Sequence, residues 1–198
     1  MHSERRRSGD PTRSAGVVML RALAGLPALA TLASCQPAMD WRSVPLPGTQ
    51  LVAELPCQPA RFERALAVAG VPLRLFMLSC EVGGVTYGVA TADVGDPARV
   101  NPVLFALRDS AAAAIRSANL PAGALKIRGI TPFSGNSSAH LHGQRPDGET
   151  VDEAVHVFAR GTRVFQASAV GAALPEAALR PFEDGLRFDL EKPAADPT

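Results

Sequence analysis

Two cysteines, Cys57 and Cys80, flank a pair of β-strand patterns, and this arrangement limits the possible folds more than any other feature of the sequence. The predicted strands cover residues 60–68 and 73–80. In an antiparallel hairpin the residue numbers of paired positions have a constant sum, so a four-residue loop over 67–70 places the two cysteines opposite each other, with a sum of 137. The sequence therefore predicts a hairpin whose open end is closed by a Cys57–Cys80 disulfide.

Closing a loop of about 24 residues stabilises a fold by roughly 3 kcal/mol in the chain-entropy model. The alternative interpretation is a pair of buried free thiols in a cytosolic protein. The sequence has neither a CxxC redox motif nor a spacing of Cys and His typical of zinc sites.

The first 34 residues have the three parts of a secretory signal peptide. Five arginines lie in the first 21 positions, and residues 22–34 form an uncharged apolar run that ends in small residues. This run of 13 residues is shorter than the roughly 20 that a transmembrane helix needs, and Gly25 and Pro27 weaken a permanent helix further. The alternative interpretation is an uncleaved amino-terminal membrane anchor.

The end of the apolar run, Leu32-Ala33-Ser34-Cys35, resembles the lipobox of bacterial lipoproteins. The resemblance implies transfer of diacylglycerol to the Cys35 sulfur, cleavage before Cys35 and acylation of the new amino terminus. Acyl chains worth about 0.8 kcal/mol per buried CH₂ then hold the protein on a membrane. Gln36, in place of Asp, is typical of lipoproteins of the outer rather than the inner membrane. The 21-residue lead is long, so we expect Met19 to be the true start.

Composition restricts the class of protein. Charged residues at 20% and a mean hydropathy of +0.08 argue against a disordered chain and against a polytopic membrane protein. The net charge of +1 gives no strong attraction to nucleic acid. If Cys35 is lipidated, an even pair of cysteines remains, as in an exported protein with one disulfide.

The mature chain is predicted to contain one domain. Residues 35–49 are the lipidated cysteine and a proline-rich linker, 50–190 the domain, and 191–198 a polar tail. Trp41 is expected to pack on the domain, and residues 51–55 to form an edge strand.

The order of the predicted elements indicates the fold class. A strand over 85–93 is followed by a long helix with Asn101 as its cap and Pro102 in its first turn. A short helix is predicted to begin at Pro175 and end at Gly185. Further strands are predicted over 125–130, 138–144, 150–160, 162–170 and 186–190. This order predicts an α+β fold, an antiparallel sheet packed by one long and one short helix.

Three parts of the chain resemble small exported proteins with a PsbP-like sandwich. They are the strand from Tyr87-Gly88-Val89 to Asp93, the long helix after it, and the stretch 160–167 with the short helix and 182–186 behind it. The resemblance covers about residues 50–190. It implies a non-catalytic envelope or accessory protein, and no functional residue is carried over because the shared positions are structural.

His140 and His142 are the best candidates for metal ligands. On a strand, residues i and i+2 project from one face about 7 Å apart, so both imidazoles can reach one ion. A third ligand would come from His156 or Asp152. The alternative is a pair of solvated histidines on the polar side of an outer strand, and we expect neither a metal nor another cofactor.

A serine hydrolase is a further candidate, because three serines lie near His140, namely Ser134, Ser137 and Ser138. Such a site needs a base, an orienting carboxylate and an oxyanion hole. Nothing in the sequence brings Asp147 or Asp152 to His140, and a polar turn explains the serines equally well.

Four arginines form a candidate cationic patch, namely Arg128, Arg145, Arg160 and Arg163. Because 18 of the 20 basic residues are arginine, composition is the simpler explanation. The chain has ten aromatic residues, too few for a base-stacking surface, and lacks Walker, GxGxxG, GxSxG, HExxH and EF-hand motifs.

The sequence therefore predicts a non-catalytic cell-envelope protein, anchored by lipid on Cys35 at the periplasmic face of a membrane. Its expected partners are that membrane and an envelope protein or small ligand. The alternatives are an envelope hydrolase or metal-binding protein that uses His140 and His142, and a membrane protein with one uncleaved anchor.

Overall fold

A computed structural model describes residues 39–118 and 123–191. The fold of these residues is α+β, as the sequence predicts, with one long and one short helix. The strands form two antiparallel sheets, whereas the sequence predicted one. The predicted signal peptide, Cys35 and most of the polar tail lie outside the described residues. Among the residues that are described, no helix has the length and apolar character to cross a membrane.

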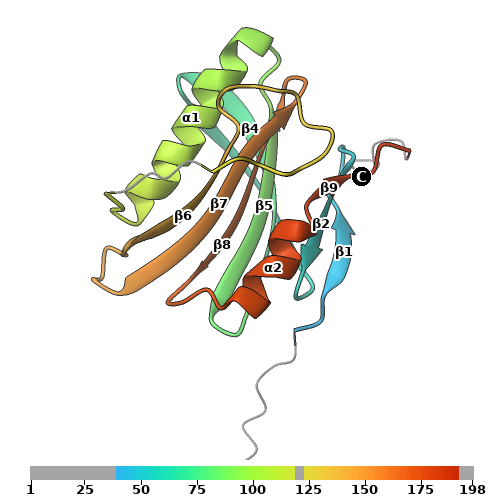
Figure 1. Cartoon of the computed structure of the whole chain (residues 1–198). Helices are drawn as coiled ribbons and strands as arrows, with labels where there is room; N and C mark the ends of the chain where they lie inside the picture. The colour runs from blue at the N-terminus through green and yellow to red at the C-terminus, as the bar shows by residue number, and fades with distance from the viewer. Residues whose placement is uncertain (1–38, 119–122, 192–198) are drawn as a thin grey trace, which may run out of the picture. The chain divides into compact units, whose positions relative to one another are not determined.

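The main sheet has six strands in the order β3-β4-β5-β8-β7-β6 (Figure 1). Every neighbouring pair in this sheet is antiparallel. The strands are β3 (Ala60–Val68), β4 (Val71–Val82), β5 (Val85–Asp93), β6 (Ser137–Gln144), β7 (Thr150–Arg160) and β8 (Arg163–Gly171). A smaller sheet has the order β1-β2-β9, with β1 (Arg42–Pro45), β2 (Leu51–Leu55) and β9 (Arg187–Phe188).

The hairpin of β3 and β4 has a tighter turn than predicted. Val68 pairs with Val71, so the loop contains only Ala69 and Gly70, and both have positive φ. Paired positions therefore sum to 139 and not to 137, because a two-residue turn with left-handed backbone matches the twist of the strands.

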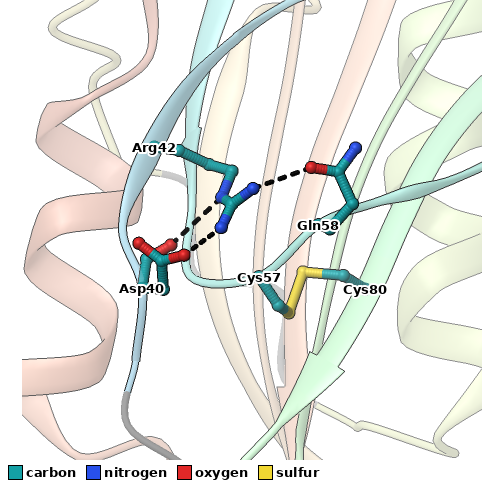
Figure 2. A network of polar contacts seen from close by, with 5 residues as sticks. All are labelled: Asp40, Arg42, Cys57, Gln58 and Cys80. Atoms are coloured by element: carbon teal, nitrogen blue, oxygen red, sulfur yellow. Dashed lines mark hydrogen bonds and ion pairs between the residues drawn. A yellow bond between two sulfur atoms is a disulfide. The ribbon is translucent and has the colours of Figure 1, made fainter.

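Cys57 and Cys80 nevertheless form the predicted disulfide, with 5.9 Å between their Cα atoms. Cys57 lies before the first residue of β3, so the ladder does not fix its position. Figure 2 shows the disulfide beside the start of β1, where Arg42 donates to Gln58 Oε1 at 2.7 Å and pairs with Asp40. The bridge thus ties the segment before β3 to β4, the second strand of the main sheet.

Helix α1 (Pro97–Ala114) begins four residues before the predicted Asn101 cap. The N-cap is Asp96, whose side chain accepts a hydrogen bond from the Ala98 amide at 2.9 Å, and Pro97 occupies the first turn. Asn101 lies inside the helix, where its side chain accepts a hydrogen bond from the Gly135 amide. The region around the start of the helix contains the Asx-Pro signal twice, at 96–97 and at 101–102, and the first copy starts the helix.

Helix α2 (Glu176–Asp184) agrees with the prediction, since Pro175 precedes it and Gly185 follows it as the C-cap. The predicted strand over 125–130 is wrong, because the chain there is irregular. A single bridge between Gly123 and Ser138 lies just before it. The last strand is shorter than predicted and covers only Arg187–Phe188.

The region expected to be a linker also needs a correction. Arg42–Pro45 forms strand β1, which pairs along its whole length with β2, and Leu46 is fully buried. The folded domain therefore begins before residue 50. Four prolines between 37 and 56 suggested an extended segment, but an edge strand tolerates proline at its end, as Pro45 does.

Side chains from the two faces of the main sheet enter two apolar clusters. Along β7, Val155 and Val157 belong to the cluster under α1, whereas Ala154 and Phe158 belong to the cluster under α2 and the small sheet. In the second cluster Tyr87 makes edge-on contacts with Trp41 at 5.9 Å and with Phe182. The predicted packing of Trp41 on the domain is confirmed.

Candidate functional site

The register of β6 and β7 brings the predicted histidines to one face of the sheet. Ser138 pairs with His156, and His142 pairs with Asp152. Because every second residue of a strand points to the same face, His140 shares this face with all four. The face is the one that α2 packs against, since Leu179 and Phe182 of α2 belong to its apolar cluster.

A carboxylate from α2 lies between two of these histidines. Glu183 Oε1 is 2.9 Å from His140 Nε2 and 3.1 Å from His156 Nε2. The contact with His156 lies outside hydrogen-bond angles, whereas the contact with His140 is a hydrogen bond. Interaction with His156 is the largest cause that lowers the pKa of Glu183; partial burial opposes it, and His140 adds to it.

His156 is the most deeply placed member of this group. The residue is 5% exposed, and within the described residues its Nδ1 atom has no hydrogen-bond partner. Ser138 bonds through its backbone to Gly123, so Ser138 and His156 form a non-hydrogen-bonded pair of the ladder. Side chains of such pairs have Cβ atoms about 4.5–5.5 Å apart, so both residues line the same cavity, although the Ser138 hydroxyl makes no hydrogen bond to the imidazole.

These side chains line a cavity of about 310 Å³ between the sheet and the end of α2. The segment before β6 also lines it and contributes the exposed Lys126, and Asp184 adds a second carboxylate. The cavity combines hydrogen-bond donors, a buried imidazole and carboxylates. These groups suit the binding of a small polar molecule or a proton transfer, provided that a substrate reaches Ser138.

The three histidines considered as metal ligands do not act together. His142 lies apart from the cavity group and contacts Asp152, with 2.6 Å between Nδ1 and Oδ1. Within residues 39–118 and 123–191, no three His, Cys, Asp or Glu side chains are arranged to hold a metal ion. Asp152, considered as a third ligand and as an orienting carboxylate, pairs with His142 and not with His140.

The three candidate serines also separate. Ser138 lines the cavity, whereas its neighbour Ser137 points to the opposite face and is buried with its hydroxyl unpartnered among the described residues. Ser134 belongs to the turn before β6. Asp147 accepts a hydrogen bond from the Glu149 amide in the turn between β6 and β7. Of these groups, only Ser138 is a candidate nucleophile.

Sequence reasoning did not identify Glu183 as part of the site. It lies 43 residues from His140 in the chain, in a helix predicted only as a packing element. No local pattern joins α2 to β6, so the contact depends on how the helix crosses the sheet. Helical periodicity places Glu183 next to the buried Phe182 and Leu179, which indicates that it lies at the border of the buried face.

Sequence reasoning also overlooked Glu153. It is 6% exposed, and burial raises its pKa to about 7. It lies on the α1 side of β7, opposite the apolar Leu141 and Val170. The alternation of Val151, Val155 and Val157 could have predicted that Glu153 is buried, because Glu153 lies at an alternate position of the same series.

Two of the four predicted arginines come together. Arg160 and Arg163 are register partners at the end of the β7–β8 hairpin. Arg145 lies in the β6–β7 turn and contacts Glu149, and Arg128 is an exposed residue of the irregular segment before β6. The patch is therefore a pair of arginines.

No family model matches this chain, and no curated protein or solved structure matches it either.

Proposed function

We propose that this chain is an exported, lipid-anchored cell-envelope protein whose single domain binds a small ligand or an envelope protein without catalysing a reaction. The anchor is Cys35, and the domain is displayed at the periplasmic face of a membrane, the outer membrane in preference to the inner. The observation that carries the proposal is the disulfide between Cys57 and Cys80, since such bonds persist in oxidising compartments.

The position of the disulfide adds support. Cys57 stands near the start of the folded domain, directly after β2 and before β3. A covalent bond there fastens the segment that connects the proposed tether to the sheet. The apolar run before Cys35 supplies the export signal, and the lipobox that ends at Cys35 supplies the site of acylation.

The resemblance to PsbP-like exported proteins belongs to the same proposal. An antiparallel sheet with one long and one short helix is compatible with such a sandwich. Small cavities on this sheet, rather than a catalytic motif, then carry the function. The cavity of His140, His156 and Glu183 is the leading candidate for the binding of a ligand.

Metabolic labelling with a clickable palmitate analogue tests the anchor. We expect the wild-type chain to take up the label and Cys35→Ala to lose it, whereas a Cys57→Ala/Cys80→Ala double variant keeps it. A wild-type chain without label, or a Cys35→Ala chain that retains it, contradicts the proposal. The intact mass distinguishes the uncleaved anchor, because cleavage after Ser34 removes the first 34 residues.

A second candidate is an envelope hydrolase, favoured by the position of Ser138 beside His156 and of His156 beside Glu183. In this hypothesis the Ser138 oxygen is the nucleophile, His156 the base and Glu183 the group that orients it. A screen with chromogenic esters distinguishes the two candidates. Turnover that disappears in both Ser138→Ala and His156→Gln but persists in His142→Gln supports the hydrolase and overturns the non-catalytic proposal.

A further inference from the structure

A second cavity lies at the C-terminal end of β7. His142 is near the other end of this strand, where it pairs with Asp152. Arg160 and Arg163 line the cavity from the β7–β8 hairpin, and the turn before β2 lines it with Gly48 and Thr49. Phe188 of β9 forms another wall, and the volume is about 300 Å³. The cavity therefore joins the main sheet to the small sheet and presents two cationic side chains.

The charges of these two arginines are balanced differently. Arg163 Nη2 lies 3.6 Å from Asp93 Oδ2, and Asp93 also accepts a hydrogen bond from the Thr162 hydroxyl. Arg160 has no Asp or Glu oxygen within 4.0 Å in the described part of the chain, and its buried Nη1 atom has no hydrogen-bond partner there. A guanidinium stays charged, and desolvated donors without acceptors are costly.

The Arg160 guanidinium is nevertheless held in place. Its carbon atom lies 5.1 Å from the centre of the Phe188 ring, a cation–π distance. Gly129, with φ of +86°, is also close, and a Cβ added there would lie 3.4 Å from Arg160 Nη1. The glycine thus lets the backbone approach the guanidinium closely. A cation fixed in this way has already lost the rotamer freedom that ligand binding would otherwise remove.

Thr49 and Gln50 are the other polar residues that line the cavity, and both interact with other residues. The Thr49 hydroxyl donates to the Leu46 carbonyl at 2.9 Å and accepts from the Leu51 amide at 3.1 Å. Thr49 therefore shapes the turn and does not compete for Arg160. Of the two arginines that line the cavity, Arg160 is the one without a carboxylate partner among the described residues.

We propose that the Arg160 cavity binds the oxyanion group, carboxylate or phosphate, of a small dissolved molecule. The planar guanidinium pairs with two oxygens of such a group at once, which an ammonium does not do. A volume of about 300 Å³ is at the small end of ligand pockets and fits a molecule of a few heavy atoms. The site goes beyond the proposed function and does not depend on the lipid anchor.

The test uses the full chain, purified in a neutral detergent and labelled with ¹⁵N-arginine. Sodium phosphate and sodium acetate are titrated separately against sodium chloride at matched ionic strength, and the Arg160 Nε–H resonance is followed. We expect a saturable shift with at least one of the two oxyanions and none with chloride. A shift that rises without saturation and equally in all three salts overturns the proposal.

Variants assign the effect to the guanidinium. Arg160→Gln is expected to weaken oxyanion binding at least tenfold, and Arg160→Lys, which keeps the charge but not the planar fork, also weakens it. The matched control is Arg145→Gln, which removes an exposed arginine paired with Glu149 and leaves the affinity unchanged. Equal weakening in the control overturns the proposal. If Arg160→Gln does not fold, the comparison of Arg160→Lys with Arg145→Gln decides.

Discussion

The Oε1 atom of Glu183 lies 2.9 Å from Nε2 of His140, so the last turn of α2 is joined to strand β6. β6 is an edge of the main sheet and has a full ladder only with β7. The same oxygen reaches the buried His156 on β7. One carboxylate thus holds the helix against two strands and closes one side of the candidate cavity.

Replacing Glu183 with Gln should destabilise the domain by about 1 kcal/mol at neutral pH, because a charge-assisted hydrogen bond is weakened at a partly exposed site. The pKa of Glu183 is lowered in the fold, so the stabilisation is complete above the unfolded value of 4.5 and is lost as pH falls through the folded pKa. Urea unfolding of both chains between pH 3 and 7 measures this.

The control for this comparison is Glu176→Gln on the exposed side of α2, where the carboxylate pairs only with Arg180. We expect a change of less than about 0.5 kcal/mol there. A difference between wild type and Glu183→Gln that stays constant down to pH 3 contradicts the assignment.

Replacing Glu153 with Gln should have the opposite sign above neutral pH. Burial raises the pKa of Glu153 to about 7, so between pH 4.5 and 7 the folded state binds more protons than the unfolded state. Stability contributed by the neutral carboxyl is therefore present below pH 4.5 and is lost as pH rises through 7. At pH 9 the Gln variant should be more stable than wild type by on the order of 3 kcal/mol, because the pKa of Glu153 rises from 4.5 in the unfolded chain to about 7 in the fold.

The measurement is the urea midpoint of both chains at pH 5 and at pH 9, with Glu63→Gln as an exposed control on β3. Glu63 pairs with Arg74 at the surface, so its removal should change stability little at either pH. If Glu153→Gln gives the same small gain at both pH values, Glu153 is not held neutral by burial.

Removing the disulfide should cost roughly 2–4 kcal/mol, since a bridge across residues 57–80 restricts the unfolded chain. The comparison is between wild type and Cys57→Ala/Cys80→Ala in urea, with and without reductant. Reductant should lower the stability of wild type to that of the double variant and leave the variant unchanged. Thiol counting on the exported protein under denaturing, non-reducing conditions should find neither cysteine reactive. Two reactive thiols contradict an oxidised pair.

Local patterns predicted the elements well where one signal dominates. The alternation over residues 150–160 and 162–170 located β7 and β8 within a residue or two, and Pro175 located α2. Where two signals compete, the sequence analysis chose the wrong one. It predicted that Asn101-Pro102 starts the helix, whereas Asp96-Pro97 does.

Tertiary contacts explain what the sequence did not predict. Residues 125–130 have strand composition, but they do not form a strand. Within the described chain, the segment before β6 pairs with β6 only through the bridge between Gly123 and Ser138. The histidines of β6 were recognised because they share a strand, whereas Glu183 and the unbalanced Arg160 depend on contacts with other elements. Contacts of that kind leave no periodic pattern.

The tight turn between β3 and β4 gives a prediction with a matched control. Ala69 has φ of +49° and Gly70 has φ of +75°. A residue with a Cβ pays roughly 1–2 kcal/mol for left-handed backbone, and glycine does not. Ala69→Gly should therefore raise stability by up to about 1 kcal/mol, after the larger entropy of glycine in the unfolded chain is subtracted.

The control is Ala67→Gly, two residues earlier on the exposed face of β3, where the backbone is extended and pairs with Pro72. There glycine adds only flexibility, so stability should fall by roughly 0.5–1 kcal/mol. The two substitutions are chemically identical, and opposite signs in the urea midpoint follow only if Ala69 is left-handed in the fold. A loss at both positions means that the hairpin closes with the four-residue loop and not with the two-residue turn.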